Sequence, residues 1–352
     1  MINITEEEIM KNWGKDLSLP IISICCITYN HEKYIEEALD GFLSQDTNFV
    51  FEILVDDDCS IDQTRNIILK YQKKYPHIIK SFLRKKNVGS MSNFIENLQR
   101  AKGQYIAICE GDDYWTDKKK LQIQISEMQK NPEVNLSFHS AKELKDDEIG
   151  KEISVYSSKN KIVTINEVIL GRGEFCPTAS IVIKKKVVDN IPSWIQAQAP
   201  IGDYFLQIFG SLEAGALYIN KSMSIYRVNS FGSWSSSIQD INKTEKFINN
   251  LVVSLNLLDN HLKFKYQLEI EHMKSQYYYS LAKSYLLSKM YKNFKDTITL
   301  CYKIDNNSFQ YKLFYYGRNF PNLLIIISMF RQLYHKFTEH IYYLKKRNNK
   351  LH

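Results

Sequence analysis

The sequence predicts an α/β fold, with a Rossmann-like mixed sheet and flanking helices, followed by an α-helical C-terminal region. Two observations lead to this prediction. Short apolar runs alternate with helix-period stretches from residue 21 to about residue 133, which is typical of a parallel sheet with crossover helices. From about residue 236 the apolar positions follow helical spacing to the end of the chain.

The first half of the α/β domain supplies strands joined by crossover helices. Each apolar run has the length of a buried strand, and each stretch between runs is long enough for a helix. The expected strands are Ile21–Thr28, Phe51–Asp57, Ile78–Leu83 and Gln104–Cys109. The expected helices lie near residues 32–44, 62–75 and 90–101.

After about residue 133 the segments become shorter and strand-like, and we interpret them as the second half of the same domain. These segments are Val134–Ser140, Ile153–Tyr156, Lys161–Ile165 and Ala179–Lys184. A stretch rich in Ser and Gly, from Asn229 to Ser237, marks its end. The expected organisation is an N-terminal lead of residues 1–19, an α/β domain of residues 20–235 and a helical, basic region of residues 236–352.

The formal net charge of +7 belongs to the C-terminal end, since the last 42 residues carry eight Lys or Arg side chains and one Glu. The first residues are acidic without an apolar run, which predicts neither a signal peptide nor an anchor. The apolar stretch Leu323–Phe330 is far shorter than the ~20 residues that span a bilayer. The six cysteines form no C-x-x-C pair, which favours a reduced, cytoplasmic protein.

Polar side chains stand at the carboxyl ends of three of the expected strands, in the segments Thr28–His31, Asp56–Asp62 and Glu110–Asp113. Ligands of an open α/β sheet bind at the carboxyl ends of its strands, so two acidic clusters converge on one crevice. Neighbouring carboxylates repel one another unless a cation compensates, and hard oxygen ligands favour Mg²⁺ or Mn²⁺ together with substrate phosphates. The expected ligand is a nucleoside diphosphate conjugate, while a turn or helix cap is the alternative for each cluster alone.

Five segments in order resemble the family 2 glycosyltransferases, which have the nucleotide-diphosphosugar transferase (GT-A) fold. The resemblance runs from about Pro20 to Ser235. It rests on ISICCITYNHEKYIEEAL, EILVDDDCSIDQT, NVGSMSNFIENL, GQYIAICEGDDYW and GDYFLQI followed by SIYRVN. It implies transfer of a hexose or N-acetylhexosamine, commonly from a UDP-sugar, to a saccharide or polyprenyl-diphosphate-linked acceptor in surface-polysaccharide synthesis.

The resemblance also implies roles for individual residues. The family's metal- and diphosphate-binding D-x-D element resembles Glu110–Asp113, with Asp113 as the principal ligand of Mn²⁺ or Mg²⁺ and Asp112 beside it. Nucleoside contacts are implied for the ends of the first two strands, namely Thr28, Tyr29, Asp57 and Asp58. The family's Arg-Asn pair after N-x-G is replaced here by Phe94 and Ile95, which leaves Asn87 and Asn93 as the polar groups for the donor ribose.

An inverting displacement needs a carboxylate that takes the proton of the acceptor hydroxyl. In similar enzymes this Asp opens a helix, and Asp203 occupies that place, with an N-cap as the alternative role. Arg227 contacts the diphosphate or pairs with a structural carboxylate. Trp115 packs on the sugar or closes the core.

Two other functions are compatible with the acidic segments. A haloacid-dehalogenase-like phosphatase would use Asp56 as nucleophile, because the residues from Asp56 to Ser60 satisfy a D-x-D-x-[ST] spacing. An inactive carbohydrate-binding relative would keep the fold without turnover.

The basic C-terminal segment, with Tyr334, Tyr342 and Tyr343, suits contact with the anionic inner face of a membrane, so the expected location is cytoplasmic and peripheral to that membrane. A partner helix and a solvated helical face are the alternatives, and nucleic acid is not expected.

Overall fold

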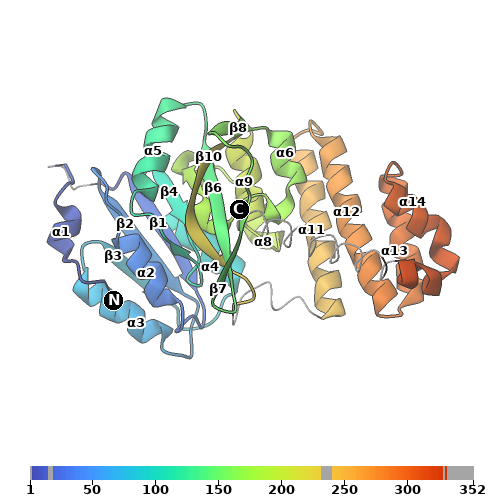
Figure 1. Cartoon of the computed structure of the whole chain (residues 1–352), viewed down its shortest axis with the longest axis horizontal. Coiled ribbons are helices and arrows are strands. Elements are labelled where there is room, and N and C mark those ends of the chain that lie inside the picture. The colour runs from blue at the N-terminus through green and yellow to red at the C-terminus, as the bar shows by residue number, and fades with distance from the viewer. Residues whose placement is uncertain (1, 15–18, 231–239, 328–329, 331–352) are drawn as a thin grey trace, which may run out of the picture. The chain divides into compact units, whose positions relative to one another are not determined.

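The computed structural model describes residues 2–14, 19–230, 240–327 and 330. They form two compact units, one comprising the described residues up to 230 with 256–258, and the other those from 240 to 255 and from 259 onward. In Figure 1 the first unit runs from blue to yellow-green and the second holds the orange and red helices. The α/β fold with a helical C-terminal region is confirmed.

In the described residues the first unit contains a ten-stranded mixed sheet of order β3-β2-β1-β4-β9-β6-β10-β5. The strands of its parallel half are β1 (Ile22–Thr28), β2 (Phe51–Asp57), β3 (Ile79–Leu83) and β4 (Tyr105–Ile108). The mixed half holds β5 (Tyr114–Trp115), β6 (Leu136–Lys145), β9 (Val182–Lys184) and β10 (Ala216–Arg227). Two further strands, β7 (Glu148–Ile153) and β8 (Lys161–Val163), pair with β6 and β10.

The helices of the first unit connect these strands and flank the sheet (Figure 1). They are α1 (Glu6–Met10), α2 (Ile35–Leu43), α3 (Thr64–Lys74), α4 (Ser90–Arg100), α5 (Lys120–Lys130), α6 (Ile165–Leu170), α7 (Lys185–Asp189), α8 (Trp194–Gln198) and α9 (Asp203–Ser211). The four strands and three crossover helices predicted for the first half are confirmed within a few residues at each end.

Side chains alternate between the two faces of the parallel strands. On β1, Ile24 and Cys26 pack in the core cluster that holds α2 and α3, whereas the Cys25 thiol points to the backbone of α4. On β2, Ile53 and Val55 pack in that same cluster. The alternation therefore directs the last residue of β2 toward α3 and the residue before it toward α4.

The prediction of a strand at Ile153–Tyr156 is wrong, because the strand β7 ends at Ile153. Asp146 and Asp147 both have positive φ, of 51° and 63°, which is the backbone of a two-residue hairpin turn. The turn returns the chain as β7, antiparallel to β6. β7 is polar and largely exposed, so it lacks the apolar pattern by which a strand is predicted.

The second unit contains α11 (Ile241–His261) except for its residues 256–258, together with α12 (Gln267–Leu287), α13 (Tyr291–Ile304) and α14 (Phe309–Tyr316). A turn at Gly317–Asn319 and a helical stretch at 321–327 follow. Its core is aromatic and aliphatic. It includes Tyr285, Phe294, Ile298, Phe314 and Leu324. The tyrosines of the basic end, Tyr334, Tyr342 and Tyr343, lie outside the described residues.

A glycine at the start of β10 tests this account of the sheet. Gly215 has a φ of +82°, and a Cβ atom there would lie 2.3 Å from the Val163 carbonyl oxygen of β8. We expect Gly215→Ala to lower the free energy of unfolding by about 2 kcal/mol or more. The matched control is Gly150→Ala on β7, whose Cβ would meet Glu143 at an ordinary 3.6 Å. Equal stability of the two variants in denaturant titrations would contradict the β8–β10 packing.

Candidate functional site

The segment after β4, Glu110–Asp113, is the centre of the candidate site and is called the acidic loop below. The Gly111 amide donates to the Ile27 carbonyl of β1 at 2.9 Å. A Cβ on Gly111 would lie 2.8 Å from the Thr28 Oγ1 atom and 3.0 Å from the Ile35 side chain. Only a glycine therefore lets the acidic loop lie directly against the end of β1.

A second set of contacts ties the acidic loop to the end of β10. The Arg227 amide donates to Asp113 Oδ1 at 2.8 Å, and the Arg227 guanidinium donates to the Asp112 carbonyl oxygen. Ser230 Oγ donates to Asp112 Oδ2 at 2.6 Å. The loop is thus clamped between two strands that are far apart in the sequence.

The Arg227 side chain has partners beyond the acidic loop. Its guanidinium forms an ion pair with Glu37 of α2 and lies over the rings of Tyr34 and Tyr114, at 4.9 and 4.7 Å from their centroids. Arg227 is 9% exposed. The pairing with a structural carboxylate, one of the two roles expected for Arg227, is present, and the cation also lies beside the acidic loop.

The carboxylates of the acidic loop perturb one another. Burial raises the pKa of Asp113 well above its usual range, and the Asp112 charge adds to this, while the Arg227 amide and cation oppose it. Burial also raises the pKa of Glu110 well above its usual range, with further increases from the charges of Asp112, Asp203 and Asp113. Such mutual repulsion is typical of a site that binds a cation.

Asp203 is the first residue of α9, and its charge acts on Glu110 of the acidic loop. Asp203 Oδ2 accepts a hydrogen bond from Thr178 Oγ1 at 2.9 Å, and Oδ1 accepts one from the Tyr204 amide at 2.8 Å. Burial raises the pKa of Asp203, while these hydrogen bonds lower it. Asp203 is therefore near enough for its charge to act on Glu110, and its role as the base stays a prediction.

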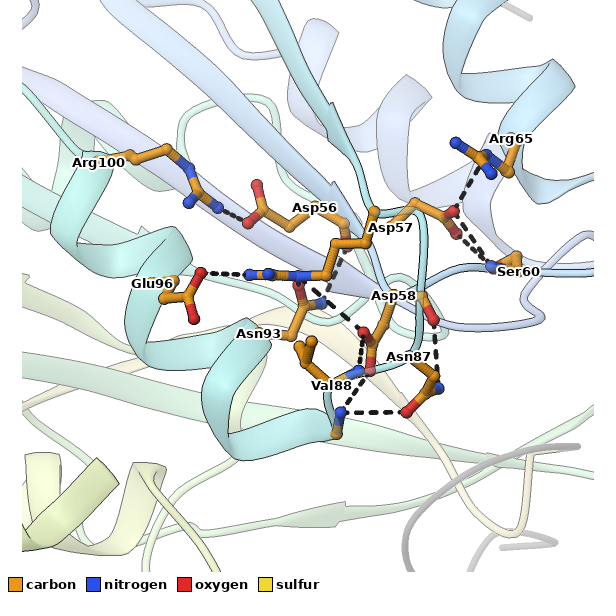
Figure 2. Close-up of polar contacts among 12 residues, drawn as sticks. Asp56, Asp57, Asp58, Ser60, Arg65, Asn87, Val88, Asn93, Glu96 and Arg100 are labelled. Atoms are coloured by element: carbon orange, nitrogen blue, oxygen red, sulfur yellow. Dashed lines mark hydrogen bonds and ion pairs between the residues drawn. The ribbon is translucent and has the colours of Figure 1, made fainter. Parts of the chain in front are cut away.

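The ends of β1 and β2 lie side by side, with Thr28 paired to Asp57 in the register of the strands. Thr28 Oγ1 is buried and makes no hydrogen bond within the described protein. Asp57 accepts from the Ser60 amide and lies 3.5 Å from the Arg65 guanidinium (Figure 2), while burial raises its pKa. Tyr29 is 38% exposed. Thr28 and Asp57 thus form a polar edge on the side of the sheet expected for the nucleoside.

Asp58 serves the neighbouring turn. Its Oδ1 and Oδ2 atoms accept from the amides of Val88 and Gly89 at 2.8 and 2.9 Å, and the Asn87 side chain donates to the Asp58 carbonyl oxygen at 3.2 Å (Figure 2). Asn93 donates to the Asp56 carbonyl oxygen at 3.2 Å. Asp58, Asn87 and Asn93 therefore fix the turn before α4, and their predicted contacts with a nucleotide stay predictions.

Sequence reasoning missed two arginines, one between β3 and α4 and the other at the end of α4. Arg84, 9% exposed, donates from Nε to the Asn93 side chain at 2.7 Å and pairs with Glu96 at 2.8 Å. Arg100 pairs with Asp56. Arg84 follows β3 by one residue and Arg100 ends α4, so neither falls in a motif. The excess of acid after β2 was the available signal, because buried carboxylates need cationic partners.

The ion pair with Arg100 bears on the phosphatase alternative. The Asp56 carboxylate pairs with Arg100 of α4, whereas a phosphatase would need this carboxylate as its nucleophile. Trp115 is buried in the core of the first unit. The residue is 3% exposed, and its indole nitrogen donates to the Ala179 carbonyl oxygen at 2.8 Å. Trp115 closes the core, which was one of its two expected roles.

The donor set of the acidic loop fits a cation that is shared with a substrate. Within the described residues no three His, Cys, Asp or Glu side chains gather as a metal site made by protein alone. Asp112 and Asp113 each direct one carboxylate oxygen to a protein donor, Ser230 and Arg227 respectively. Mg²⁺ commonly takes one or two carboxylates and completes its shell with phosphate oxygens and water. The residues fit that mode of binding.

A mixed sheet of this order, with an acidic loop at the carboxyl ends of its strands, places the chain in the class of GT-A nucleotide-sugar-transferase folds. Residues 23–191 match the family model described as glycosyl transferase family 2.

Relatives with known sequences agree with this. An uncharacterised protein of Mycobacterium tuberculosis is 35% identical over 223 residues, which are 63% of each chain. The putative teichuronic acid biosynthesis glycosyltransferase TuaG of Bacillus subtilis is 34% identical over 119 residues, 34% of this chain and 44% of that protein. The chain thus matches less than two thirds of the length of these relatives.

Solved structures share the fold. Staphylococcus aureus TarS 1–349, in complex with UDP-GlcNAc, aligns with a TM-score of 0.65 at 19% identity over 85% of this chain and 87% of that chain. The mannosyltransferase PcManGT of Pyrobaculum calidifontis, in complex with GDP-Man and Mn²⁺, aligns with a TM-score of 0.51 at 12% identity over 91% of both chains. At these identities the likeness concerns the fold.

The raised pKa of Asp113 predicts how stability depends on pH. A carboxyl whose pKa is raised by folding stabilises the fold below its unfolded pKa, and that stabilisation is lost as pH rises through the folded pKa. In the presence of a chelator, Asp113→Asn should therefore unfold at a higher temperature than the wild type at pH 8, with a smaller difference at pH 5. Asn keeps an oxygen that accepts from the Arg227 amide. A variant less stable than wild type at pH 8 would contradict the repulsion in the acidic loop.

Proposed function

We propose that the chain is an inverting glycosyltransferase that uses a nucleotide sugar, by default a UDP-sugar carrying a hexose or N-acetylhexosamine. The observation that carries the proposal is the acidic loop itself, which contacts from β1 and β10 hold at the carboxyl end of β4. The match of residues 23–191 to the glycosyl transferase family 2 model supports it. So do the UDP-GlcNAc and GDP-Man complexes of proteins with the same fold.

In the proposed complex the nucleoside lies at the ends of β1 and β2. The buried Thr28 hydroxyl lacks a protein partner, which leaves it available to the base or ribose. Asp57 accepts from a nucleoside N–H or hydroxyl, with Tyr29 beside it. Asp58 acts through the turn at Val88 and Gly89, which Asn87 and Asn93 brace. The edge of the sheet is held rigid for the donor by these contacts.

The diphosphate then lies at the acidic loop. Asp113, with Asp112, would hold Mn²⁺ or Mg²⁺ there, and the bound cation would neutralise charge on the departing nucleoside diphosphate. Arg227 offers a guanidinium beside the same loop, and its ion pair with Glu37 fixes the direction of that charge. These residues orient the leaving group and exclude water from it.

Asp203 acts as the base on the acceptor side. Its Oδ1 and Oδ2 atoms are oriented by Tyr204 and Thr178, and burial raises its pKa, which strengthens the carboxylate as a base. The acceptor oxygen attacks the anomeric carbon as its proton passes to Asp203, and the bond to the diphosphate breaks. The configuration at the anomeric carbon inverts, and no bond to the enzyme forms.

The acceptor class follows from the relatives rather than from the site. The similarity to TuaG, described as a putative teichuronic acid biosynthesis glycosyltransferase, supports a role in the synthesis of cell-surface polysaccharide. The acceptor that we propose is a saccharide, free or linked to polyprenyl diphosphate. A cytoplasmic location, where nucleotide sugars are made, belongs to this proposal. An inactive carbohydrate-binding relative would have no use for a second carboxylate coupled to the acidic loop.

The base has a specific test. We expect Asp203→Asn to lower the transfer rate by about 10²–10⁴-fold with little change in donor binding. The wild-type rate should fall as pH drops through the raised pKa of Asp203, because a protonated carboxyl takes no proton, and the variant should lack this acid limb. Release of nucleoside diphosphate from UDP-sugars and GDP-Man, with Mn²⁺ and a candidate acceptor, measures the rate.

The control for this experiment is Asp147→Asn, which changes an exposed carboxylate in the β6–β7 hairpin turn. It should transfer sugar at the wild-type rate. An Asp203→Asn variant that transfers as fast as the control would remove Asp203 from the mechanism. Absence of donor turnover in all proteins, combined with donor binding, would favour the inactive relative.

A further inference from the structure

The second unit exposes an unusual amount of apolar side chain on α14 and the segment after it. Phe309 is 76% exposed, Phe320 66%, Leu323 56% and Phe330 69%. Other apolar residues of the same segment, including Phe314 and Leu324, are buried in the core of the unit. The buried apolar side chains therefore account for the packing of this segment. The exposed apolar side chains have no packing role within the unit.

Three of these exposed side chains, Phe309, Phe320 and Leu323, line a groove of about 430 Å³. The groove is lined by apolar residues of α14 and the helical stretch 321–327, with Lys312 as the one charged residue among them. We call the set Phe309, Phe320, Leu323, Ile326 and Phe330 the apolar surface. Contiguous exposed apolar surface of this kind marks an interaction site in many proteins.

The net positive charge of residues 306–338 indicates what kind of partner the apolar surface binds. From residue 306 to residue 338 the sequence contains no Asp or Glu, whereas Lys312, Arg318, Arg331 and Lys336 are cationic. Lys312 is exposed at the groove. Arg318 lies over the Tyr315 ring at 4.0 Å and donates to the Tyr315 carbonyl oxygen at 2.6 Å. A partner of this surface must therefore be both apolar and anionic.

Two occupants from this chain fit poorly. A second copy that paired the same surface would place like charges opposite one another. The chain's own last residues, 331–352, carry six Lys or Arg and one Glu, so they would bring more positive charge to Lys312. The phosphates of a nucleic acid could pair with Lys312 and Arg318, but its backbone has no apolar surface to bury the exposed Leu323 and Ile326 side chains.

We infer that the apolar surface, with Lys312 and Arg318, docks on an anionic lipid surface. Phe and Leu side chains insert at the boundary between headgroups and acyl chains, while Lys at the rim contacts anionic headgroups. Within the described residues no helix has the length and apolar character needed to cross a bilayer. This inference does not depend on the proposed sugar transfer.

The test is flotation of the full chain with vesicles of phosphatidylcholine alone or with 30% phosphatidylglycerol. The wild type should bind the anionic vesicles at least about tenfold more tightly, and high salt should weaken this binding. The double variant Phe320→Ser, Leu323→Ser should bind at least about tenfold more weakly, and Lys312→Glu should lose part of the preference for anionic lipid. The matched control is Leu268→Ser, which removes an 84% exposed leucine from α12 of the same unit.

Several results would overturn the inference. One is a double variant that binds anionic vesicles as tightly as the wild type. Another is vesicle binding that is lost only when residues 331–352 are deleted. Either result would show that a part of the chain other than the apolar surface contacts the lipid. Equal binding to both vesicle types would also contradict it. Light scattering that shows a dimer in the wild type and a monomer in the double variant would assign the surface to a second copy. A DNA preference over vesicles would assign it to nucleic acid. Circular dichroism of each variant verifies that the helical unit is folded.

Discussion

The candidate site depends on a cluster of carboxylates held in a place where they repel one another. Asp113 and Glu110 have pKa values well above their usual range because the fold buries them beside Asp112. The loop keeps this arrangement because Gly111 bonds to β1 and because Arg227 donates to Asp112 and Asp113 from β10. The backbone thus keeps carboxylates close to one another, which lowers the stability of the fold. Such arrangements are common at sites that bind a cation or a substrate.

The sheet topology explains why these groups meet. Because β1, β2 and β4 are parallel neighbours, the residues that follow them share one edge. Side-chain alternation then separates the last two residues of β2, so that Asp57 faces α3 and Asp56 faces α4. Asp56 belongs to an internal ion pair, and this removes the nucleophile that a phosphatase would need. Two neighbouring residues therefore have different roles: Asp57 belongs to the candidate site, and Asp56 belongs to the core.

The sequence was informative where one local pattern determined the structure. Apolar runs located the parallel strands, and the acidic loop was found because it directly follows one of them. Sequence reasoning failed where a distant partner decided the role. Nothing local assigns Arg84 to Asn93 and Glu96, or Arg100 to Asp56, since those pairs join separate elements. The polar strand β7 was misplaced for a related reason, because its position is set by the turn at Asp146 and Asp147.

The central claim is that the acidic loop binds a nucleoside diphosphate together with a divalent cation. Calorimetric titration of UDP into the protein, with Mn²⁺ and then with a chelator, tests it most directly. The account predicts UDP binding that strengthens at least about tenfold with Mn²⁺ in the wild type, because the cation joins the carboxylates to the diphosphate. It also predicts loss of that increase in Asp113→Asn. Equal UDP affinity with Mn²⁺ and with chelator, in both proteins, would contradict it.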